Sequence, residues 1–364
     1  MANSLWARRA GGFFAGVLAL GACAHSAAAQ GKDSAVAQGN EGAPAKVRKQ
    51  IVQQYGAFGP EGLRMREQLW IMPSGDPTRG LRATVFRPED DDAGENAGAE
   101  QKPHPLVVIN HGTSSATRLS VAMPVYYWLS KWFVDRGYVV VVPQRRGHGA
   151  TGGDLDESVG TCANPDHARS GEIAADDIEA VVNYMTREPD IAPHATVVVG
   201  ISTGGWASLA LAARNPGEVR AIVNMAGGRG GHAGGQPHAI CGRDRLVEAA
   251  GRFGSTARIP TLWLYSENDS YFGPKLASDM AEAWRAGGAA AELDILPPYG
   301  SDGHDIANDR AGWDAWGAIA DRFLAAPDTR APDTREMASS VSAAAPAASA
   351  IETRLETGAL QPGR

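Results

Sequence analysis

The strongest chemical signal in the sequence is the motif GISTG at positions 200–204, which has Ser202 at its centre. A β-branched run at 196–199 precedes it and an alanine- and leucine-rich segment follows, so the pattern predicts a strand, a sharp turn and a helix. Such a turn strains the serine backbone, and Gly200 and Gly204 keep the strand and the helix from clashing. Because a helix N-terminus also favours the negative charge of acyl transfer, we predict that Ser202 is a nucleophile. A chance match is the alternative in a chain with 44 glycines, and the predicted strand and helix argue against it.

A serine hydroxyl attacks a carbonyl only if a base takes its proton and a third group holds that base. In a parallel sheet such groups gather at the carboxyl ends of the strands. Asp269 lies just past one later predicted strand, and His304 lies in the loop after the last one. The order Ser202, Asp269, His304 along the chain therefore predicts a nucleophile, an acid and a base.

Acidic neighbours compete for the role of the acid. Glu267 and Asn268 directly precede Asp269, and Glu267 is the alternative acid if the loop turns differently. Asp302 and Asp305 flank the predicted base and are expected to be solvated loop residues.

The anion formed in acyl transfer needs two N–H donors, one of them from the residue after the nucleophile. Thr203 supplies the first, and we predict that the backbone N–H of Thr113, at the end of another strand, supplies the second. The side chain of His111 is expected to brace that loop. The sequence contains no HExxH, no paired CxxC and no GxxxxGK motif, so no metal and no nucleotide cofactor is predicted.

Strand and helix patterns alternate from residue 106 onward, which is typical of a mostly parallel sheet with helices on both faces. Two earlier stretches, 64–72 and 81–87, alternate like half-buried strands and predict an antiparallel start to the sheet. The later expected strands are 106–110, 138–143, 196–202, 221–225, 260–265 and 291–296, and the expected helices are 121–136, 174–186, 245–250, 274–286 and 312–325.

Length and composition favour one α/β catalytic domain with flanking tails. The chain has 364 residues, of which 43% are hydrophobic and 21% charged. We place the catalytic domain at 61–326, a linker at 30–60 and a disordered tail at 327–364, and expect an irregular cap at about 227–257 to cover part of the site. The net charge of −7 and the scattered basic residues exclude a nucleic-acid partner.

The N-terminus predicts export. Arg8 and Arg9 precede a short apolar run at 13–22, as in a signal peptide, which we place at 1–29. Cleavage after Ala29 competes with a lipoprotein-type site before Cys23, where that cysteine would be lipidated. The protein is thus expected to be periplasmic or secreted, or else anchored to the outer membrane through Cys23.

Two further cysteines remain in the exported chain. In an oxidising compartment an isolated pair is more often bridged than free, so Cys162 and Cys241 are predicted to form a disulfide. Such a bridge would tie the predicted cap to the loop that follows the strand at 138–143.

The segment 106–324 resembles the α/β-hydrolase superfamily. Its motifs VVINHGTS, VVPQRRGHGATGG, VVVGISTGG, LWLYSENDSYFGP and the final GH look most like the dienelactone hydrolase and prolyl-oligopeptidase branch. The resemblance implies the triad roles for Ser202, Asp269 and His304, and a structural role for the turn at 145–149. Dienelactone hydrolases proper use a cysteine nucleophile, so the serine in this chain leaves their particular substrate open.

These patterns together predict an exported serine hydrolase that cleaves carboxylic esters through an acyl-enzyme. A serine exopeptidase with the same residues is the alternative, and a non-catalytic binding module is a third possibility. A peptidase needs a charged group for a chain terminus, and the sequence does not place its four candidates. They are Asp154, Asp156, Glu157 and Arg243. The expected substrate is a small-molecule ester or a short peptide, and the sequence leaves the oligomeric state open.

Overall fold

The computed structural model describes residues 54–89, 102–114, 117–120 and 123–329. The predicted signal peptide, both cleavage sites and Cys23 lie outside the described residues, as do most of the predicted linker and the chain from residue 330 onward. All of the described residues belong to one compact unit.

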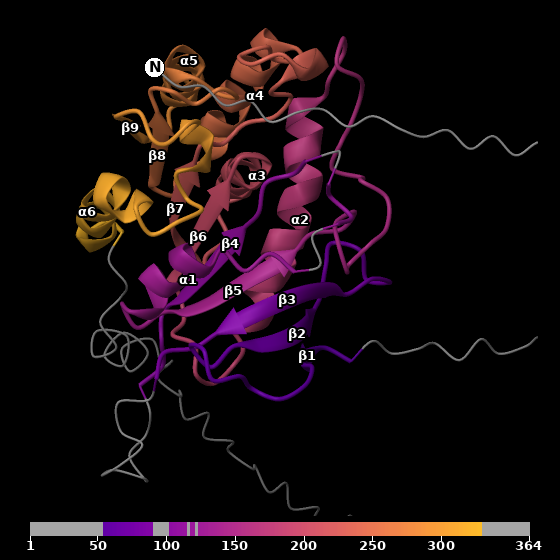
Figure 1. The fold of residues 1–364 in the computed structure, drawn as a ribbon, viewed down its shortest axis with the longest axis vertical. Coiled ribbons are helices and arrows are strands. Elements are labelled where there is room, and N and C mark those ends of the chain that lie inside the picture. Colours follow the sequence, from indigo (N-terminus) through magenta and orange to yellow (C-terminus); the bar gives the residue numbers. More distant parts are fainter. Residues whose placement is uncertain (1–53, 90–101, 115–116, 121–122, 330–364) are drawn as a thin grey trace, which may run out of the picture. The chain divides into compact units, whose positions relative to one another are not determined.

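The described residues form nine strands in a single sheet, in the order β1-β2-β3-β5-β4-β6-β7-β8-β9 (Figure 1). The first three neighbouring pairs are antiparallel and the other five are parallel, which confirms the mostly parallel sheet that the sequence predicts. The strands are β1 (Gly56–Ala57), β2 (Gln68–Met72), β3 (Leu81–Phe86), β4 (Leu106–Asn110), β5 (Val139–Gln144), β6 (Thr196–Ile201), β7 (Val219–Met225), β8 (Thr261–Ser266) and β9 (Glu292–Leu296).

Helices cover both faces of the sheet. Helices α2 to α5 pack in one hydrophobic core on one face, and α1 and α6 pack in a second core on the other. Strands β4, β5, β6 and β8 are buried throughout because both faces are covered, which is why they read as continuous apolar runs. The helices are α1 (Tyr127–Val134), α2 (His167–Met185), α3 (Thr203–Ala212), α4 (Arg243–Thr256), α5 (Pro274–Ala286) and α6 (Gly312–Ala325), with short 3₁₀ turns η1 (Ala233–Gly235) and η2 (Gly303–Asp305). No helix in the described part of the chain is both long and apolar enough to cross a membrane.

The structure differs from the sequence prediction in the extent of three helices. Helix α1 is shorter than expected and begins at Tyr127. Helix α2 begins seven residues earlier than expected, at His167, because the Asp166 side chain caps it by accepting the N–H of Arg169 at 2.8 Å. Helix α4 extends to Thr256 and buries an apolar face between its neighbours, so the segment at 227–257 is irregular only up to Gly242.

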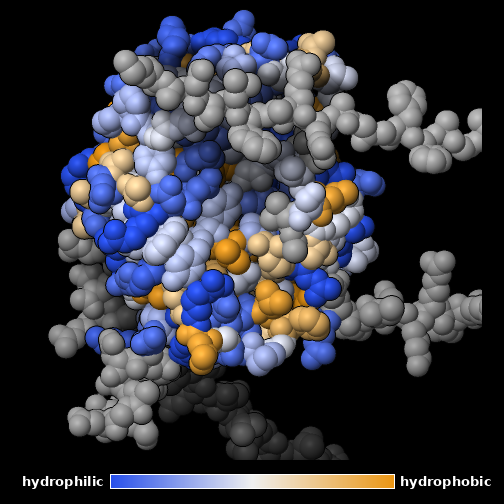
Figure 2. Space-filling model, in the orientation of Figure 1, coloured by the Kyte–Doolittle hydropathy of each residue, from blue (hydrophilic) through white to orange (hydrophobic). Residues whose placement is uncertain are grey.

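The edges of the catalytic domain also differ from expectation. Strand β1 lies inside the predicted linker and pairs with β2, so Gly56 and Ala57 belong to the sheet. At the other end, Thr329 lies inside the predicted tail but is buried, and its hydroxyl donates to the carbonyl of Phe323 at the end of α6. The face shown in Figure 2 is largely hydrophilic, with hydrophobic residues gathered in its lower part. Phe58, directly after β1, and Leu69, in β2, are exposed.

The structure contains a disulfide between Cys162 and Cys241, with the two Cα atoms 4.6 Å apart. The bridge joins the loop after β5 to the segment just before α4, as the sequence predicts. His167, the first residue of α2, lies against it, since its Nε2 atom is 2.8 Å from the carbonyl oxygen of Cys241.

Removal of the bridge is expected to destabilise the protein. The two cysteines are 79 residues apart in sequence, so the bridge restricts a long loop of the unfolded chain. For the variant Cys162→Ser/Cys241→Ser we expect a loss of about 2–4 kcal/mol in the free energy of unfolding, measured by urea denaturation under non-reducing conditions. The same loss should appear in the wild type on reduction, and an unchanged unfolding midpoint in both experiments would contradict the prediction.

Candidate active site

Ser202 occupies a strained turn between β6 and α3. Its backbone has φ 55° and ψ −122°, an unusual conformation for a residue with a side chain. A Cβ atom on Gly200 would lie 2.2 Å from the carbonyl oxygen of Gly204, and one on Gly204 would lie 2.2 Å from that of Asn110. The two glycines of the motif are therefore needed for the close approach of α3 to β6 and β4, as the sequence predicts.

Thr203 is the first residue of α3, so its backbone N–H lies in the helical turn that has no intrahelical partner. The neighbouring strand end, which carries Gly112, touches the serine directly. A Cβ atom on Gly112 would lie 3.0 Å from the Cβ atom of Ser202. The backbone after β4 and the N-terminus of α3 thus meet at Ser202.

Asp269 and His304 are brought together at the ends of β8 and β9. The Nδ1 atom of His304 lies 3.2 Å from each carboxylate oxygen of Asp269. Asp269 is fully buried, and its Oδ1 atom also accepts the backbone N–H groups of Tyr271 at 2.7 Å and Phe272 at 2.8 Å. Glu267, the alternative acid, is exposed, so the structure pairs the histidine with Asp269.

Asp302 differs from the solvated loop residue expected from the sequence. Its Oδ1 atom accepts the backbone N–H groups of His304 and Ser270, both at 3.0 Å, and its Oδ2 atom accepts the Ser270 hydroxyl at 2.5 Å. Burial raises the pKa of Asp302, but these hydrogen bonds outweigh it and the pKa is lowered. Asp302 therefore caps η2 and holds the backbone of His304, whereas Asp305 is exposed as expected.

His111 braces the loop after β4, as predicted. Its Nε2 atom accepts the backbone N–H of Arg145 at 3.0 Å, so the ring proton lies on Nδ1, which donates to the carbonyl of Gly112 at 2.8 Å. Burial lowers the pKa of His111 well below its usual value, and the charge of Arg145 lowers it further. The ring is thus a neutral group that fixes the orientation of the Gly112 carbonyl.

A buried ion pair lies beneath the site and was not predicted from the sequence. The Nε and Nη2 atoms of Arg145 donate to the two carboxylate oxygens of Glu157 at 2.7 and 3.2 Å, and both side chains are almost fully buried. Burial raises the pKa of Glu157, but the charge and hydrogen bonds of Arg145 and the charge of Arg229 outweigh it and hold the pKa well below its usual range. Arg229 also donates to the backbone carbonyl of Glu157.

This ion pair is joined to the loops on both sides of Ser202. The Thr113 hydroxyl oxygen lies 3.2 Å from a carboxylate oxygen of Glu157 and 2.8 Å from Nε2 of His148, and the Thr203 hydroxyl donates to Thr113 at 2.9 Å. The Nη1 atom of Arg145 donates to the carbonyl of His111 at 2.8 Å. Glu157, a peptidase candidate in the sequence, is therefore committed to holding the two threonine-bearing loops together.

Two cavities open on either side of Ser202. The first has a volume of about 500 Å³ and includes Gly112, Ser202 and His304 in its wall. The second has a volume of about 360 Å³ and includes Ser202, Thr203 and the disulfide. Among the residues that the structure describes, no group of three or more His, Cys, Asp or Glu side chains is arranged to hold a metal ion.

Comparisons with known proteins agree on the fold. Residues 97–326, more than half of the chain, match the model of the dienelactone hydrolase family. The chain is similar to the acylaminoacyl peptidase of Pyrococcus horikoshii, with 14% identity, a TM-score of 0.52 and coverage of 74% of this chain and 43% of that one. It is also similar to dipeptidyl peptidase 4 of Porphyromonas gingivalis, with 15% identity, a TM-score of 0.51 and coverage of 70% and 34%. An esterase of Pyrococcus furiosus has 13% identity, a TM-score of 0.49 and coverage of 75% and 96%.

At these identities the likeness to solved structures concerns the α/β-hydrolase fold alone. The chain spans less than half the length of either peptidase. No curated protein matches the chain in sequence.

Proposed function

Because the chain belongs to the dienelactone hydrolase family, we propose that this hydrolase uses Ser202 to cleave carboxylic esters through an acyl-enzyme. The observation that carries the proposal is the convergence of three groups at the carboxyl edge of the sheet. Ser202 stands in its strained turn, His304 lines the same cavity, and the histidine ring is hydrogen-bonded to the buried Asp269.

In the proposed reaction, His304 is the base and Asp269 orients it. An ionised carboxylate only accepts hydrogen bonds, so the ring proton of His304 lies on Nδ1 and the Nε2 atom is free to take the Ser202 proton. The serine oxygen attacks the ester carbonyl, and the alcohol leaves with the proton from Nε2. Water, deprotonated by the same nitrogen, then attacks the acyl-enzyme and releases the acid and Ser202.

The backbone N–H groups of Thr113 and Thr203 would hold the anion formed in each step. The carbonyl and the N–H of a trans peptide point in opposite directions. His111 holds the Gly112 carbonyl on one side of the loop, so the Thr113 N–H of the same peptide is directed to the other side without any rearrangement. This preorganised donor and the unpaired N–H at the start of α3 support the oxyanion role.

The positions of the four peptidase candidates do not support a peptide substrate. Asp154 and Asp156 are exposed and line neither cavity beside Ser202. Arg243 lines a different cavity and pairs with Asp279, and Glu157 is paired with arginine. None of the four is therefore available to bind the charged terminus of a peptide next to the serine. A serine exopeptidase with the same triad remains the alternative.

Export to the periplasm or the cell exterior is part of the proposal. The disulfide supports it, because such bridges persist in oxidising compartments. Lipidation at Cys23 stays a prediction, since that residue lies outside the described part of the chain.

The proposal is tested with a fluorophosphonate probe and a panel of p-nitrophenyl esters and aminoacyl p-nitroanilides. We expect covalent labelling of the wild type at Ser202, no labelling of Ser202→Ala, and turnover of the esters. Labelling that persists in Ser202→Ala, or no labelling of the wild type, would refute the serine mechanism. Turnover of the anilides alone would establish the peptidase instead.

A further inference from the structure

Ser202 lies where the two cavities meet, and only a few of the described residues are shared between their walls. The shared residues are Thr113, Ser202 and Tyr271. His304 lines the first cavity and is absent from the second, whereas Thr203 lines the second and is absent from the first. The base and the N-terminus of α3 therefore face different cavities.

This division determines where each half of an ester can lie. The oxygen of the leaving alcohol must come within hydrogen-bond reach of the Nε2 atom of His304, because that nitrogen supplies its proton. The alcohol is thus confined to the first cavity. The acyl group, on the other side of the same carbonyl carbon, points away from the base and into the second cavity.

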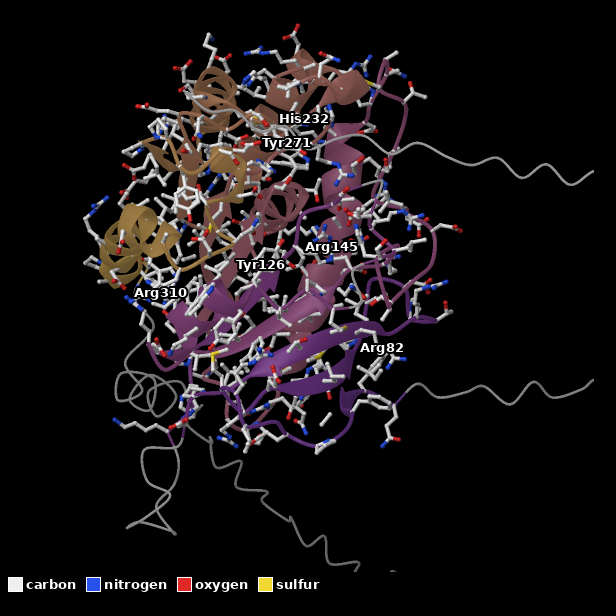
Figure 3. The ribbon with its side chains drawn as sticks, viewed as in Figure 1. Arg82, Tyr126, Arg145, His232, Tyr271 and Arg310 are labelled. Carbon is white, nitrogen blue, oxygen red and sulfur yellow. A yellow bond between two sulfur atoms is a disulfide. The ribbon has the colours of Figure 1, made fainter. Side chains whose placement is uncertain are left out.

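Tyr271 forms the wall between the two cavities, and two histidines hold its ring. It stacks on His232 with ring centroids 3.5 Å apart and on His304 with centroids 4.2 Å apart. The Nε2 atom of His232 lies 2.8 Å from the hydroxyl oxygen of Ser270, whose own proton goes to Asp302. Figure 3 shows His232 and Tyr271 next to each other, with Tyr126 of the first cavity lower in the view.

The walls of the two cavities differ in chemistry. Apolar and aromatic side chains contribute much of the first wall, namely Pro124, Val125, Tyr126, Tyr127 and Ile201. Six hydrogen-bonding side chains lie in the second wall, namely Ser158, Thr161, His167, Ser170, Arg229 and His232. Those of His167, Ser170 and His232 are bonded to other protein groups, which leaves the hydroxyls of Ser158 and Thr161 and the positive charge of Arg229 to face a ligand. No carboxylate of the described residues lines the second cavity, and beside it two guanidinium groups, from Arg145 and Arg229, share the single carboxylate of Glu157.

We propose that the enzyme selects esters that join a short acyl group bearing a hydrogen-bond acceptor to a larger apolar or aromatic alcohol. The acyl group occupies the smaller polar cavity, and the disulfide and His232 limit its length. The alcohol occupies the larger cavity beside Tyr126 and Val125. This inference rests on the proposed ester hydrolase function, and Tyr271 is its specificity-determining residue.

The first experiment varies each half of the ester separately, with every kcat/KM divided by the rate constant of hydroxide-catalysed hydrolysis. Among p-nitrophenyl esters we expect the corrected kcat/KM for acetate to exceed that for octanoate by at least 10-fold. The value for 3-methoxypropanoate should exceed that for pentanoate, which has the same length, by at least 3-fold. Among acetates we expect the corrected kcat/KM for benzyl acetate and 2-naphthylmethyl acetate to exceed that for methyl acetate by at least 10-fold. A preference for octanoate together with no preference among the alcohols would overturn the inference.

Matched filling variants test the assignment of the two cavities. Val159→Phe narrows the second cavity. It should increase the ratio of kcat/KM for acetate to that for octanoate at least 5-fold, with a smaller effect on the alcohol series. Val125→Phe narrows the first cavity and should remove the preference for 2-naphthylmethyl acetate, with a smaller effect on the acyl series. The opposite pattern would show that the halves of the ester are reversed.

Substitution of Tyr271 tests the wall itself. Tyr271→Phe keeps the ring and should retain the preference for a short acyl group. Tyr271→Ala joins the cavities and should bring kcat/KM for octanoate within about 3-fold of that for acetate. If a folded Tyr271→Ala variant retains the full preference for acetate, Tyr271 does not separate the two cavities. Ser202→Ala provides the background in every assay. If no ester shows turnover that depends on Ser202, both this inference and the proposed function fail, whereas a reversed pattern with such turnover overturns the inference alone.

Discussion

Replacement of Ser202 by alanine is expected to lower kcat for p-nitrophenyl acetate by about 10⁴- to 10⁶-fold. The variant loses the only atom that forms the acyl-enzyme in the proposed mechanism, while the cavities and the oxyanion donors stay in place. Alanine has the same backbone requirement as serine at φ 55°, so the unfolding midpoint should stay close to that of the wild type. Stopped-flow and steady-state assays measure the loss, and circular dichroism checks the fold.

Cooperation between the three groups sharpens this prediction. Asp269→Asn should lower kcat by about 10⁴-fold, because the amide no longer keeps the ring proton of His304 on Nδ1, where the mechanism requires it. The double variant Ser202→Ala/His304→Gln should be no slower than Ser202→Ala alone, since the base has no function without its nucleophile. Multiplicative losses in the double variant would indicate that Ser202 and His304 act in separate steps and would contradict the triad.

A matched serine elsewhere in the chain controls for the substitution itself. Ser255 is exposed on α4, and its hydroxyl donates only to the carbonyl of Arg252 at 2.7 Å. Ser255→Ala should therefore keep both the activity and the labelling by the fluorophosphonate probe. A comparable loss of activity in this variant would show that the effect of Ser202→Ala is not specific.

The positions of Ser202, Asp269 and His304 could be predicted because each follows a predicted strand of a parallel sheet. The carboxyl ends of such strands share one edge, so the order of strands along the chain is enough to bring the three together. The bracing role of His111 could be predicted on the same ground. The glycines at 200 and 204 add local evidence, since only a close approach of helix to strand requires both.

Other features depend on contacts between distant segments and leave little local pattern. Helix α4 contains Gly251 and Gly254, so the sequence predicts a helix only at 245–250, yet a Cβ atom on Gly254 would lie 2.2 Å from the carbonyl oxygen of Trp284 in α5. The glycine that weakens the helical pattern is thus what permits the packing. Glu157 stands in a loop without periodicity, and nothing near it in sequence indicates that the loop folds back under Thr113.

The second large effect is expected from Glu157→Gln. The amide keeps the size of the side chain but leaves Arg145 and Arg229 buried without a carboxylate. Loss of one partner of a buried ion pair costs about 3–5 kcal/mol, so we expect a decrease of this size in the free energy of unfolding. An exposed ion pair provides the comparison. Glu292→Gln breaks the contact with Arg322 and should change the free energy of unfolding by less than about 1 kcal/mol.

Glu157→Gln should also lower kcat by about 10²-fold with a smaller change in KM. Glu157 lies 3.2 Å from the Thr113 hydroxyl oxygen, and that oxygen accepts the hydroxyl of Thr203. Without the carboxylate, the two loops that carry the proposed oxyanion donors are held less precisely, and the loss falls on the transition state more than on the bound ester. Kinetics at a temperature where the variant remains folded separate this loss from unfolding.

A second buried ion pair distinguishes this positioning role from a general loss of stability. Asp177 is as buried as Glu157, pairs with Arg146 at 2.7 Å and lines neither cavity beside Ser202. Asp177→Asn should therefore also destabilise the protein, but its folded fraction should lose less than about 5-fold in kcat because no oxyanion donor depends on it. Equal losses of kcat in the two variants would mean that Glu157 contributes to activity only through stability. A selective loss in Glu157→Gln would instead place the alignment of the Thr113 and Thr203 loops under the control of this carboxylate.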